Sequence, residues 1–440
     1  MTRPPATFHS APGEARLVEA LCLVMFILVG TDVVSVVVGE GSSLIAQLRL
    51  LSYLGILGLS VAYHRVVVGA LLAAPWLTAL IGMACLSVLW SISPATTLRS
   101  LVHFLGCTAL GLLLGRALSL RGLILFLARL ALTIAVVSLI AVALFPSARG
   151  VPPWDYVWRG IFSHKNALGG GCAILLPLVA HAAFAERGAR RLLFSSGTLG
   201  LLILLAASFS RTSQIIAGIA LCNLGLAVAL PSRQRAWASA STTMFLFIVF
   251  GLPLLFSTTL PGLFFESIGR QPTMSGRIPL WQTVWPWVEQ RPWLGFGYGA
   301  FWDPQSRRVF EISLAPDIQY IPFYSHNGVI EVLLGLGAVG LALLSMVYLQ
   351  VFVAIFRTMR KRPEALDLAP VLITLISFLL LNMTEAPVLQ QNSLAWIIFV
   401  MFVVRLGTLA RSASRHPNPS GTDETGRDAS LSIRPSAPRG

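Results

Sequence analysis

An arginine and a histidine, Arg277 and His326, stand near the two ends of a long polar segment at about residues 259–326. The rest of the chain consists mostly of apolar runs. A guanidinium group binds phosphate oxygens through paired N–H donors, and an imidazole exchanges a proton near neutral pH. This combination predicts a site for a phosphate-bearing substrate, with Arg277 as a phosphate ligand and His326 as the proton-transfer group.

A second group of polar residues precedes the apolar run that begins near residue 167. Arg159, His164, Lys165 and Asn166 all fall between residues 159 and 166. A helix that begins here would present free N–H groups and a positive dipole end to a phosphate. We therefore predict that these four side chains bind substrate. The alternative is a polar loop anchored to lipid headgroups, with Asn166 as a helix cap.

Three single residues complete the candidate site. Arg211 separates two apolar runs and has no oppositely charged neighbour in the sequence. A charge near membrane depth is usually paired or functional, so we predict an anionic ligand for it, the alternative being an arginine that snorkels to the interface. Asn327 is predicted to bond a sugar hydroxyl or to cap the next helix. Glu385, at the end of an apolar run, is predicted to orient an arginine or His326.

Tryptophan and glycine are concentrated in the polar loops. Seven of the eleven tryptophans lie in two of these loops, which is typical of an interfacial belt. Some of the rings are also suited to stack on sugar faces. The Pro292–Gly299 stretch alternates glycine with aromatic residues, which predicts a bent, flexible lid over the site.

Composition excludes several classes of protein. The 440 residues are 55% hydrophobic and 11% charged, whereas soluble domains carry about 25% charged residues. The formal charge of +14 lies mostly in short loops and near the C-terminus, so it indicates membrane topology and not a nucleic-acid partner. The sequence has no HExxH, Walker or CxxC motif, and we predict neither a metal ion nor a cofactor.

Hydropathy predicts the fold. A membrane span requires about 20 apolar residues, and positive residues gather in alternate connections between the runs, which places both termini in the cytoplasm. The prediction is an all-α integral membrane protein of about twelve transmembrane helices, with one long extracytoplasmic loop that carries short helices. The predicted spans are 17–38, 42–62, 66–90, 99–118, 122–145, 167–185, 192–208, 211–230, 238–258, 327–356, 365–383 and 392–410.

The chain divides into two predicted parts. Residues 1–410 form a membrane domain that includes the long loop at about 259–326, and residues 411–440 form a tail. The tail is rich in Ser, Pro, Gly, Asp and Arg, which predicts a disordered cytoplasmic segment. The run that starts at Leu17 lacks a convincing cleavage site and is interpreted as a retained first helix.

Taken in order, these motifs resemble the O-antigen ligase / O-antigen polymerase superfamily, and they are more similar to its exopolysaccharide-polymerase branch. The resemblance spans roughly residues 150–400. His164-Lys165-Asn166 and the neighbourhood of Glu385 are the segments that favour the polymerase branch. The remaining motifs are Arg159–Gly169, Ser210-Arg211, Ser275-Gly276-Arg277 with Trp281, Pro292–Gly299, and His326-Asn327 ahead of a glycine-rich helix.

The resemblance implies a metal-independent, inverting glycosyltransferase without a cofactor, in the bacterial inner membrane. Its donor would be an undecaprenyl-diphosphate-linked oligosaccharide. Its acceptor would be lipid A–core in a ligase or a growing polysaccharide in a polymerase, at a site facing the periplasm. Arg211 and Arg277 would hold the diphosphate, and His326 would act on the acceptor.

Two other functions stay open from the sequence. A transporter or flippase for a polyprenyl-lipid-linked glycan would bind the same diphosphate, but would place its arginines at mid-membrane depth and show repeat symmetry. A non-catalytic subunit of a polysaccharide assembly machine would not need His326.

Overall fold

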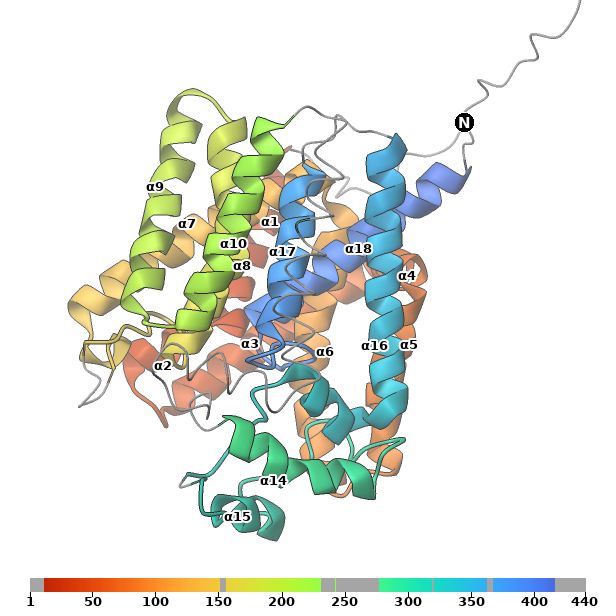
Figure 1. Ribbon diagram of the computed structural model, residues 1–440. Coiled ribbons are helices and arrows are strands. Elements are labelled where there is room, and N and C mark those ends of the chain that lie inside the picture. The colour runs from red at the N-terminus through yellow and green to blue at the C-terminus, as the bar shows by residue number, and fades with distance from the viewer. Residues whose placement is uncertain are drawn as a thin grey trace, which may run out of the picture.

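The computed structural model describes residues 12–150, 156–230, 242, 277–318, 320–361 and 367–415. The regular elements of these residues are helices (Figure 1). Eight helices of the described chain are long and apolar enough to cross a membrane, or nine if the bent pair α4–α5 counts as one span. The predicted all-α integral membrane fold is therefore confirmed.

Because the predicted span at 238–258 lies outside the described residues apart from position 242, the count of twelve spans stays a prediction. The main helices are α1 (Pro12–Gly30), α2 (Val33–Val38), α3 (Ser43–Ala62), α4 (His64–Ala73), α5 (Pro75–Leu86), α6 (Pro94–Ala117), α7 (Leu120–Leu144), α8 (Lys165–Ala185), α9 (Gly188–Ala207), α10 (Arg211–Ala229), α14 (Arg277–Gln290), α15 (Arg307–Ser313), α16 (Gly328–Lys361), α17 (Leu368–Leu381) and α18 (Leu394–Arg415).

Two predicted spans are interrupted. The 17–38 span is wrong in extent because α1 ends at Gly30, where the Asp32 N–H donates to the carbonyl of Ile161 (2.8 Å) instead of continuing the helix. The 66–90 span is a broken pair, bent by 105° between α4 and α5. Pro75 causes the break, since proline has no N–H to donate and disfavours a helical residue before it.

The longest helix, α16, opens at Gly337, whose φ of 63° lies in the left-handed region that favours glycine. The turn at residues 292–297 fills this opening. Ala338 N–H donates to the Pro292 carbonyl (2.8 Å), and Phe296 N–H donates to the Leu334 carbonyl (2.8 Å). A Cβ at Gly337 would lie 2.3 Å from the Trp293 backbone, so glycine is the residue that permits this contact.

This packing contradicts the predicted lid. Gly295 to Tyr298 are buried, and the Tyr298 hydroxyl donates to the carbonyl of Leu389 (2.5 Å). The glycines serve close backbone approach instead of movement, because Cβ atoms at Gly295 and Gly297 would each lie under 3 Å from neighbouring atoms. The Pro292–Gly299 segment is thus an anchor that ties the loop to the bundle.

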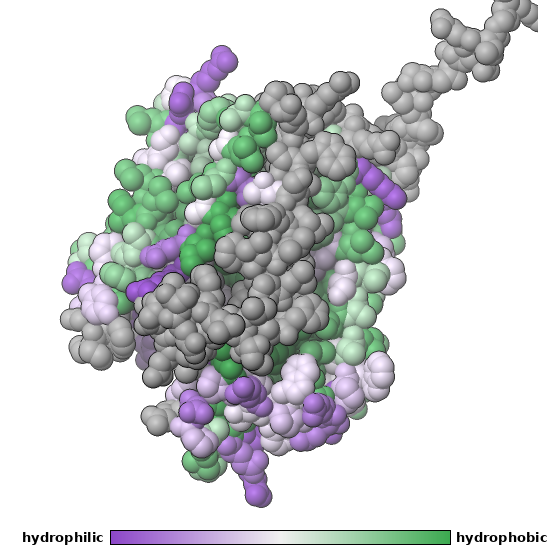
Figure 2. Space-filling model, viewed as in Figure 1, coloured by the Kyte–Doolittle hydropathy of each residue, from purple (hydrophilic) through white to green (hydrophobic). Residues whose placement is uncertain are grey.

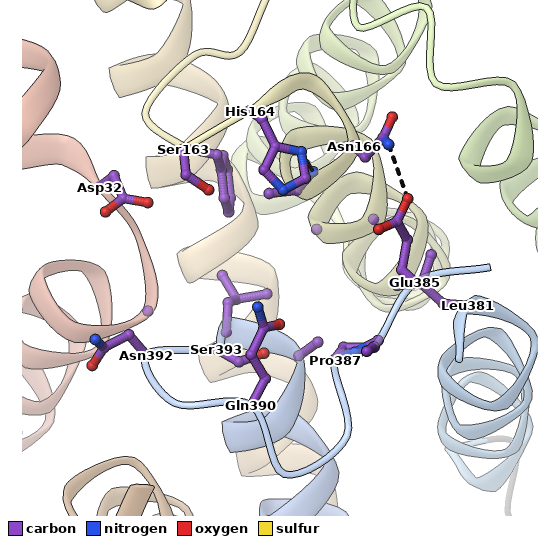
Figure 3. A pocket seen from close by; sticks show the side chains of 18 of the residues that line it. Asp32, Ser163, His164, Asn166, Leu381, Glu385, Pro387, Gln390, Asn392 and Ser393 are labelled. Carbon is purple, nitrogen blue, oxygen red and sulfur yellow. Dashed lines mark hydrogen bonds between the residues drawn. The ribbon is translucent and has the colours of Figure 1, made fainter. Parts of the chain in front are cut away.

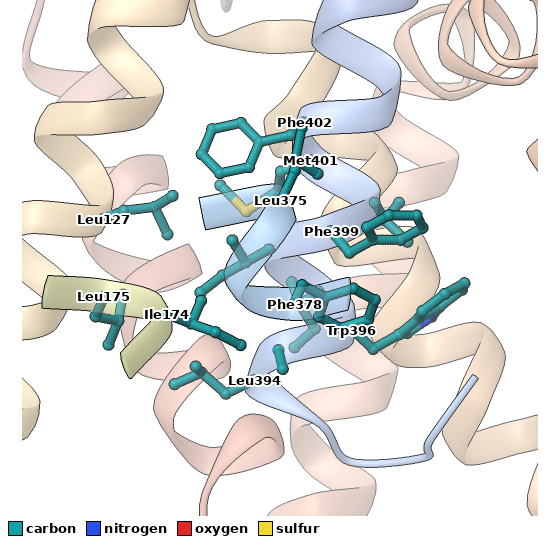
Figure 4. Packing of buried hydrophobic residues seen from close by; sticks show 14 of the residues in the cluster. Leu127, Ile174, Leu175, Leu375, Phe378, Leu394, Trp396, Phe399, Met401 and Phe402 are labelled. Atoms are coloured by element: carbon teal, nitrogen blue, oxygen red, sulfur yellow. The ribbon is translucent and has the colours of Figure 1, made fainter. Parts of the chain in front are cut away.

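Helix α18 forms the centre of the bundle and packs most extensively on α6. Figure 4 shows Trp396, Phe399 and Phe402 of α18 among buried residues of other helices. Gly111 and Gly115 of α6 face Val400 and Met401 so closely that a Cβ would clash with either. Small residues of this kind let helix backbones approach in lipid, where packing rather than water exclusion drives association. The indole of Trp396 donates to Thr108 Oγ1 (3.0 Å), which satisfies its buried N–H group.

A smaller apolar cluster forms a cap at one end of the bundle. It joins α14 and α15 to the first turns of α16 through Leu280, Val309, Ile330 and Leu334. Figure 1 shows these helices at the lower end of the bundle, and in Figure 2 hydrophilic residues gather there while hydrophobic ones dominate the sides. The described part of the long loop therefore carries two short helices, as predicted.

Helix α18 includes residues 411–415, which are the last residues described at this end of the chain. The first five residues of the predicted tail are therefore helical, and the rest of the predicted disordered tail stays a prediction. Residues 416–440 lie outside the described residues.

Candidate functional site

The carboxylate of Glu385 is the centre of the candidate site. It lies in the connection between α17 and α18. At the start of this connection, Asn382 forms hydrogen bonds with backbone groups of three other residues. Asn382 Nδ2 donates to the Phe378 carbonyl (2.7 Å), Asn382 Oδ1 accepts from Val388 N–H (3.0 Å), and its carbonyl accepts from Gly328 N–H (2.7 Å). This connection is consequently fixed to the first residue of α16.

Four side chains from three regions of the chain donate to Glu385. Oε1 is ion-paired with Arg277 at the start of α14 and accepts from Asn166 Nδ2 in α8 (2.9 Å). Oε2 accepts from His326 Nδ1 (3.1 Å) and from the Tyr324 hydroxyl (3.3 Å). A buried carboxylate is stable only with this kind of partnership.

The electrostatics keep Glu385 ionised. Burial alone would raise its pKa, but the hydrogen bond from His326 and the nearby positive charge of Arg277 outweigh burial and hold the pKa below its ordinary value. The site therefore presents a fixed negative charge between a guanidinium group and an imidazole. The sequence-based prediction that Glu385 orients an arginine or His326 describes this placement.

His326 is held with one ring nitrogen available. A carboxylate only accepts hydrogen bonds, so Nδ1 carries the hydrogen that faces Glu385, and the neutral ring has its lone pair on Nε2. Nε2 makes no hydrogen bond to a described residue, and 22% of the side chain is exposed. The backbone of His326 has a φ of 52°, a strained conformation that neighbouring bonds must hold in place.

Glu331 and Asn327 supply those bonds. Glu331 Oε2 accepts from the Ser325 N–H (3.0 Å), the Ser325 hydroxyl (2.9 Å) and the Trp302 indole (3.0 Å). Asn327 Oδ1 accepts from the N–H groups of Val329 (2.9 Å) and Ile330 (3.2 Å). Asn327 is therefore a helix cap, which was one of its two predicted roles.

Tyr324 links His164 to the carboxylate, and sequence reasoning missed it. His164 Nδ1 accepts from Ala167 N–H (3.4 Å), so His164 caps α8 in place of Asn166. His164 Nε2 lies 3.2 Å from the Tyr324 hydroxyl, which in turn donates to Glu385. The sequence could have indicated Tyr324 only through its closeness to His326, which it precedes by two residues.

The surroundings shift the pKa values of both residues. Burial lowers the pKa of His164, although the negative charge of Glu385 opposes this shift. Burial and the charge of Glu385 both raise the pKa of Tyr324.

The other predicted cations lie around this cluster. Arg159 donates to the carbonyls of Ser147 and Ser163 and pairs with Glu40 (3.2 Å), so it holds the loop ahead of α8. Lys165 is exposed as the first residue of α8. Arg211 is exposed as the first residue of α10 and has no hydrogen bond or ion pair to a described residue.

The starts of α8 and α10 are in close contact. A Cβ at Gly169 would lie 2.6 Å from Ser210 Cβ, so this glycine allows the two helix starts to meet. Arg211 follows Ser210 directly, which places it beside the first turns of α8 but not within the Glu385 cluster. The free N–H groups and the positive dipole ends of both helices therefore face one end of the bundle.

A cavity of about 100 Å³ opens next to the cluster. Figure 3 shows His164 on one side of it and Glu385 with Asn166 on another, facing polar side chains that the sequence analysis missed. The sequence did offer a reason to predict Asp32, because a carboxylate inside an apolar run is unfavourable in a membrane and is therefore usually functional. The polar residues not predicted from sequence are Asp32, Ser163, Gln390, Asn392 and Ser393. Among the described residues, no three His, Cys, Asp or Glu side chains converge as a metal site requires.

Comparison with known proteins agrees with the resemblance. Residues 196–345 match a family model described as O-antigen ligase. The exopolysaccharide production protein ExoQ of Rhizobium meliloti (strain 1021) is 27% identical over 324 residues, which cover 71% of this chain and 72% of the relative. Together these matches support a likeness to an O-antigen ligase/polymerase-like superfamily.

The O-antigen ligase match accounts for only part of the site. It contains Arg211, Arg277 and His326, whereas Asn166 and Glu385 lie outside residues 196–345. The carboxylate that holds His326 thus comes from a later segment of the chain. Only folding brings the two segments together.

Proposed function

We propose that the chain is a metal-independent, inverting glycosyltransferase that transfers or polymerises an undecaprenyl-diphosphate-linked glycan on the periplasmic side of the bacterial inner membrane. The observation that carries this proposal is that one carboxylate, Glu385, contacts both a guanidinium group and an imidazole. The groups that we propose as phosphate ligand and proton acceptor, Arg277 and His326, are thus held by the same carboxylate.

In the proposed reaction, an acceptor hydroxyl attacks the anomeric carbon of the donor while the bond to the diphosphate oxygen breaks. The diphosphate leaves with the bonding electrons, and attack from the opposite face inverts the anomeric centre. No general acid is required because diphosphate is already a good leaving group. Arg277, with Arg211 from α10, stabilises the charge that develops on its oxygens.

His326 Nε2 takes the proton of the attacking hydroxyl. The hydrogen bond from Nδ1 to Glu385 fixes the ring orientation and stabilises the imidazolium that forms (3.1 Å). Placing a carboxylate behind a histidine in this way keeps the acceptor nitrogen directed at the substrate. Asn166 donates to Oε1 of Glu385 and Tyr324 donates to Oε2. These two hydrogen bonds keep the carboxylate from rotating away from His326.

The nature of the acceptor is the finer part of the proposal. The relative is named an exopolysaccharide production protein, which favours a growing polysaccharide, whereas the family description favours transfer to lipid A–core. The polar cavity beside His164 suits either acceptor, because hydroxyl and amide groups line it.

The test is to incubate the purified protein in lipid nanodiscs with a lipid-linked repeat unit. A ladder of products indicates a polymerase, and product formed only with added lipid A–core indicates a ligase. Formation of no glycosidic bond under either condition overturns the proposal, and accumulation of donor on the opposite leaflet would identify a flippase. In the same assay His326→Ala should abolish product while donor binding persists, and His64→Ala, an exposed histidine outside the site, is the matched control.

A further inference from the structure

A second polar cavity, of about 230 Å³, lies between α4, α6 and α18. Residues Arg116, Thr408, Arg411 and Ser412 contribute its polar lining. Leu394, at the start of α18, lines the first cavity, and Arg411 follows it by 17 residues. At 1.5 Å per residue the two cavities are about 25 Å apart along α18, so the second one is separate from the candidate site.

Arg116 lines this cavity, and Arg405 precedes the lining residue Thr408 by about one turn of α18. Each of these two arginines has one buried N–H group without a partner. Arg116 Nη1 and Arg405 Nε are inaccessible to solvent and have no hydrogen-bond acceptor among the described residues. Their two charges also repel each other, and no described carboxylate pairs with either. Both side chains are partly buried, but a solvent-inaccessible N–H group without an acceptor is unfavourable. The arrangement therefore favours an anionic ligand that can accept from these groups.

The surrounding residues make room for such an anion. A Cβ at Gly69 would lie 3.1 Å from Arg116 Nε, so glycine here leaves space beside the guanidinium group. The hydroxyls of Thr408 and Ser412 donate to the carbonyls of Val404 (2.9 Å) and Thr408 (3.1 Å). Their oxygens still have lone pairs and can accept a hydrogen bond from a hydroxyl group of the ligand.

We propose that this cavity binds a phosphate group through Arg116 and Arg411, with Arg405 adding positive charge one helical turn before Thr408. The phosphate comes from the head group of an anionic phospholipid or from soluble phosphate. Two planar guanidinium groups bind phosphate oxygens in the bidentate manner that ammonium groups cannot reproduce. The hydroxyls of Thr408 and Ser412 add acceptors for a hydroxyl-bearing head group such as glycerol.

The experiment measures binding to the purified full chain in neutral detergent. Phosphatidylglycerol, phosphatidylcholine and inorganic phosphate are titrated separately, with native mass spectrometry for the lipids and thermal stability for phosphate. Retention of phosphatidylglycerol over phosphatidylcholine identifies a lipid head group as the source, and stabilisation by inorganic phosphate alone identifies soluble phosphate. Either result supports the site if Arg116→Gln and Arg405→Gln each weaken binding about fivefold, which corresponds to the contribution of one arginine near an anionic head group.

Arg191→Gln is the matched control, because Arg191 is exposed at the start of α9 and outside this cavity. If Arg116→Gln does not yield monodisperse protein, Arg411→Lys keeps the charge of a lining residue but removes the fork and should weaken binding as well. Equal binding by the wild-type chain and both variants overturns the proposal. So does lipid binding that appears only after removal of residues 416–440, since the acidic residues Asp423, Glu424 and Asp428 would then be the natural occupants.

Discussion

The two ends of the helical bundle place their partly buried arginines in opposite electrostatic settings. At the end that carries His326, Arg277 is paired with Glu385 and Arg159 with Glu40. At the other end, Arg116 and Arg405 repel each other and pair with no described carboxylate.

The difference has a functional meaning. In the proposed reaction, the Glu385 carboxylate that already holds Arg277 would be displaced or shared when the diphosphate binds, so the ligand would compete with an internal anion. Such competition would favour release of the leaving group after each turnover. At the proposed phosphate site, an arginine pair without an internal anion would gain the full electrostatic benefit of its ligand, which favours an occupant that stays bound.

The largest effect is expected from Glu385→Gln. The variant removes the charge that orients His326 and balances Arg277, so glycosyl transfer should fall by about 10²–10⁴-fold, the usual contribution of proton transfer by a positioned group. The measurement is the turnover rate with a lipid-linked donor, with Glu289→Gln on the exposed side of α14 as the control. Adding Glu385→Gln to His326→Ala should cause little further loss, because the two residues act as a unit. Additive losses would show that Glu385 works independently of the histidine.

Arg277→Lys should have the next largest effect. An ammonium group keeps the charge but loses the planar fork, so it can neither bridge Glu385 nor take two phosphate oxygens at once. We expect turnover to fall about 10–100-fold at saturating donor, which corresponds to a loss of about 1.4–2.7 kcal/mol of transition-state stabilisation. Arg307→Lys is the control, since Arg307 is 92% exposed and pairs only with Glu311 on its own helix. Unchanged turnover in Arg277→Lys would remove the arginine from the proposed chemistry.

The pH dependence of stability should change in His164→Gln. Burial lowers the folded-state pKa of His164 below its ordinary value of 6.5. The unfolded chain therefore takes up a proton before the folded chain does, and stability falls as pH decreases from 6.5 toward the folded pKa. Thermal unfolding in detergent at pH 7.5 and pH 5.5 should show a smaller acid-side decrease for the variant.

A second acid-side loss should remain in that variant. The folded pKa of Glu385 is held below its ordinary value of 4.5, so its contribution to stability is complete above that pH and is lost as pH falls through the folded pKa. An identical pH profile for wild type and His164→Gln between pH 5.5 and 7.5 would contradict the assignment of the upper step to His164.

The smallest effect is expected from Glu40→Gln. The Glu40 side chain is 77% exposed, and Arg159 keeps its bonds to the Ser147 and Ser163 carbonyls without it. An exposed ion pair contributes about 1 kcal/mol or less. Unfolding temperature and turnover should therefore both remain close to wild type, and a large loss of either would mean that Glu40 belongs to the working part of the site.

The sequence predicted the all-α membrane fold because the length of an apolar run follows directly from bilayer thickness, whereas the orientation inferred from alternating charges stays a prediction. Hydropathy failed where backbone geometry overrides it, as at Pro75 and Gly337. Pro292–Gly299 was the clearest error, since glycine serves both flexible and tightly packed backbone and only the contacts distinguish them.

The candidate site was predicted in part. His326, Arg277, Glu385, His164 and Asn166 were singled out from the sequence, and the structure brings them together. What sequence spacing could not provide was the hydrogen bonding between segments more than a hundred residues apart. Tyr324 is an ordinary aromatic residue in a loop until the fold places it between His164 and Glu385.

The opening of α16 at Gly337 has a consequence for exchanging parts between relatives. The turns of α16 before Gly337 pack on α14 and α15 through Ile330 and Leu334, while the opening takes its hydrogen bonds from residues 292–297. The start of α16, directly after His326, is thus built as part of the cap that α14 and α15 form. A chimera that transplants the loop of another protein should be joined at Gly337, because a junction at His326 would separate the imidazole from the scaffold that holds it.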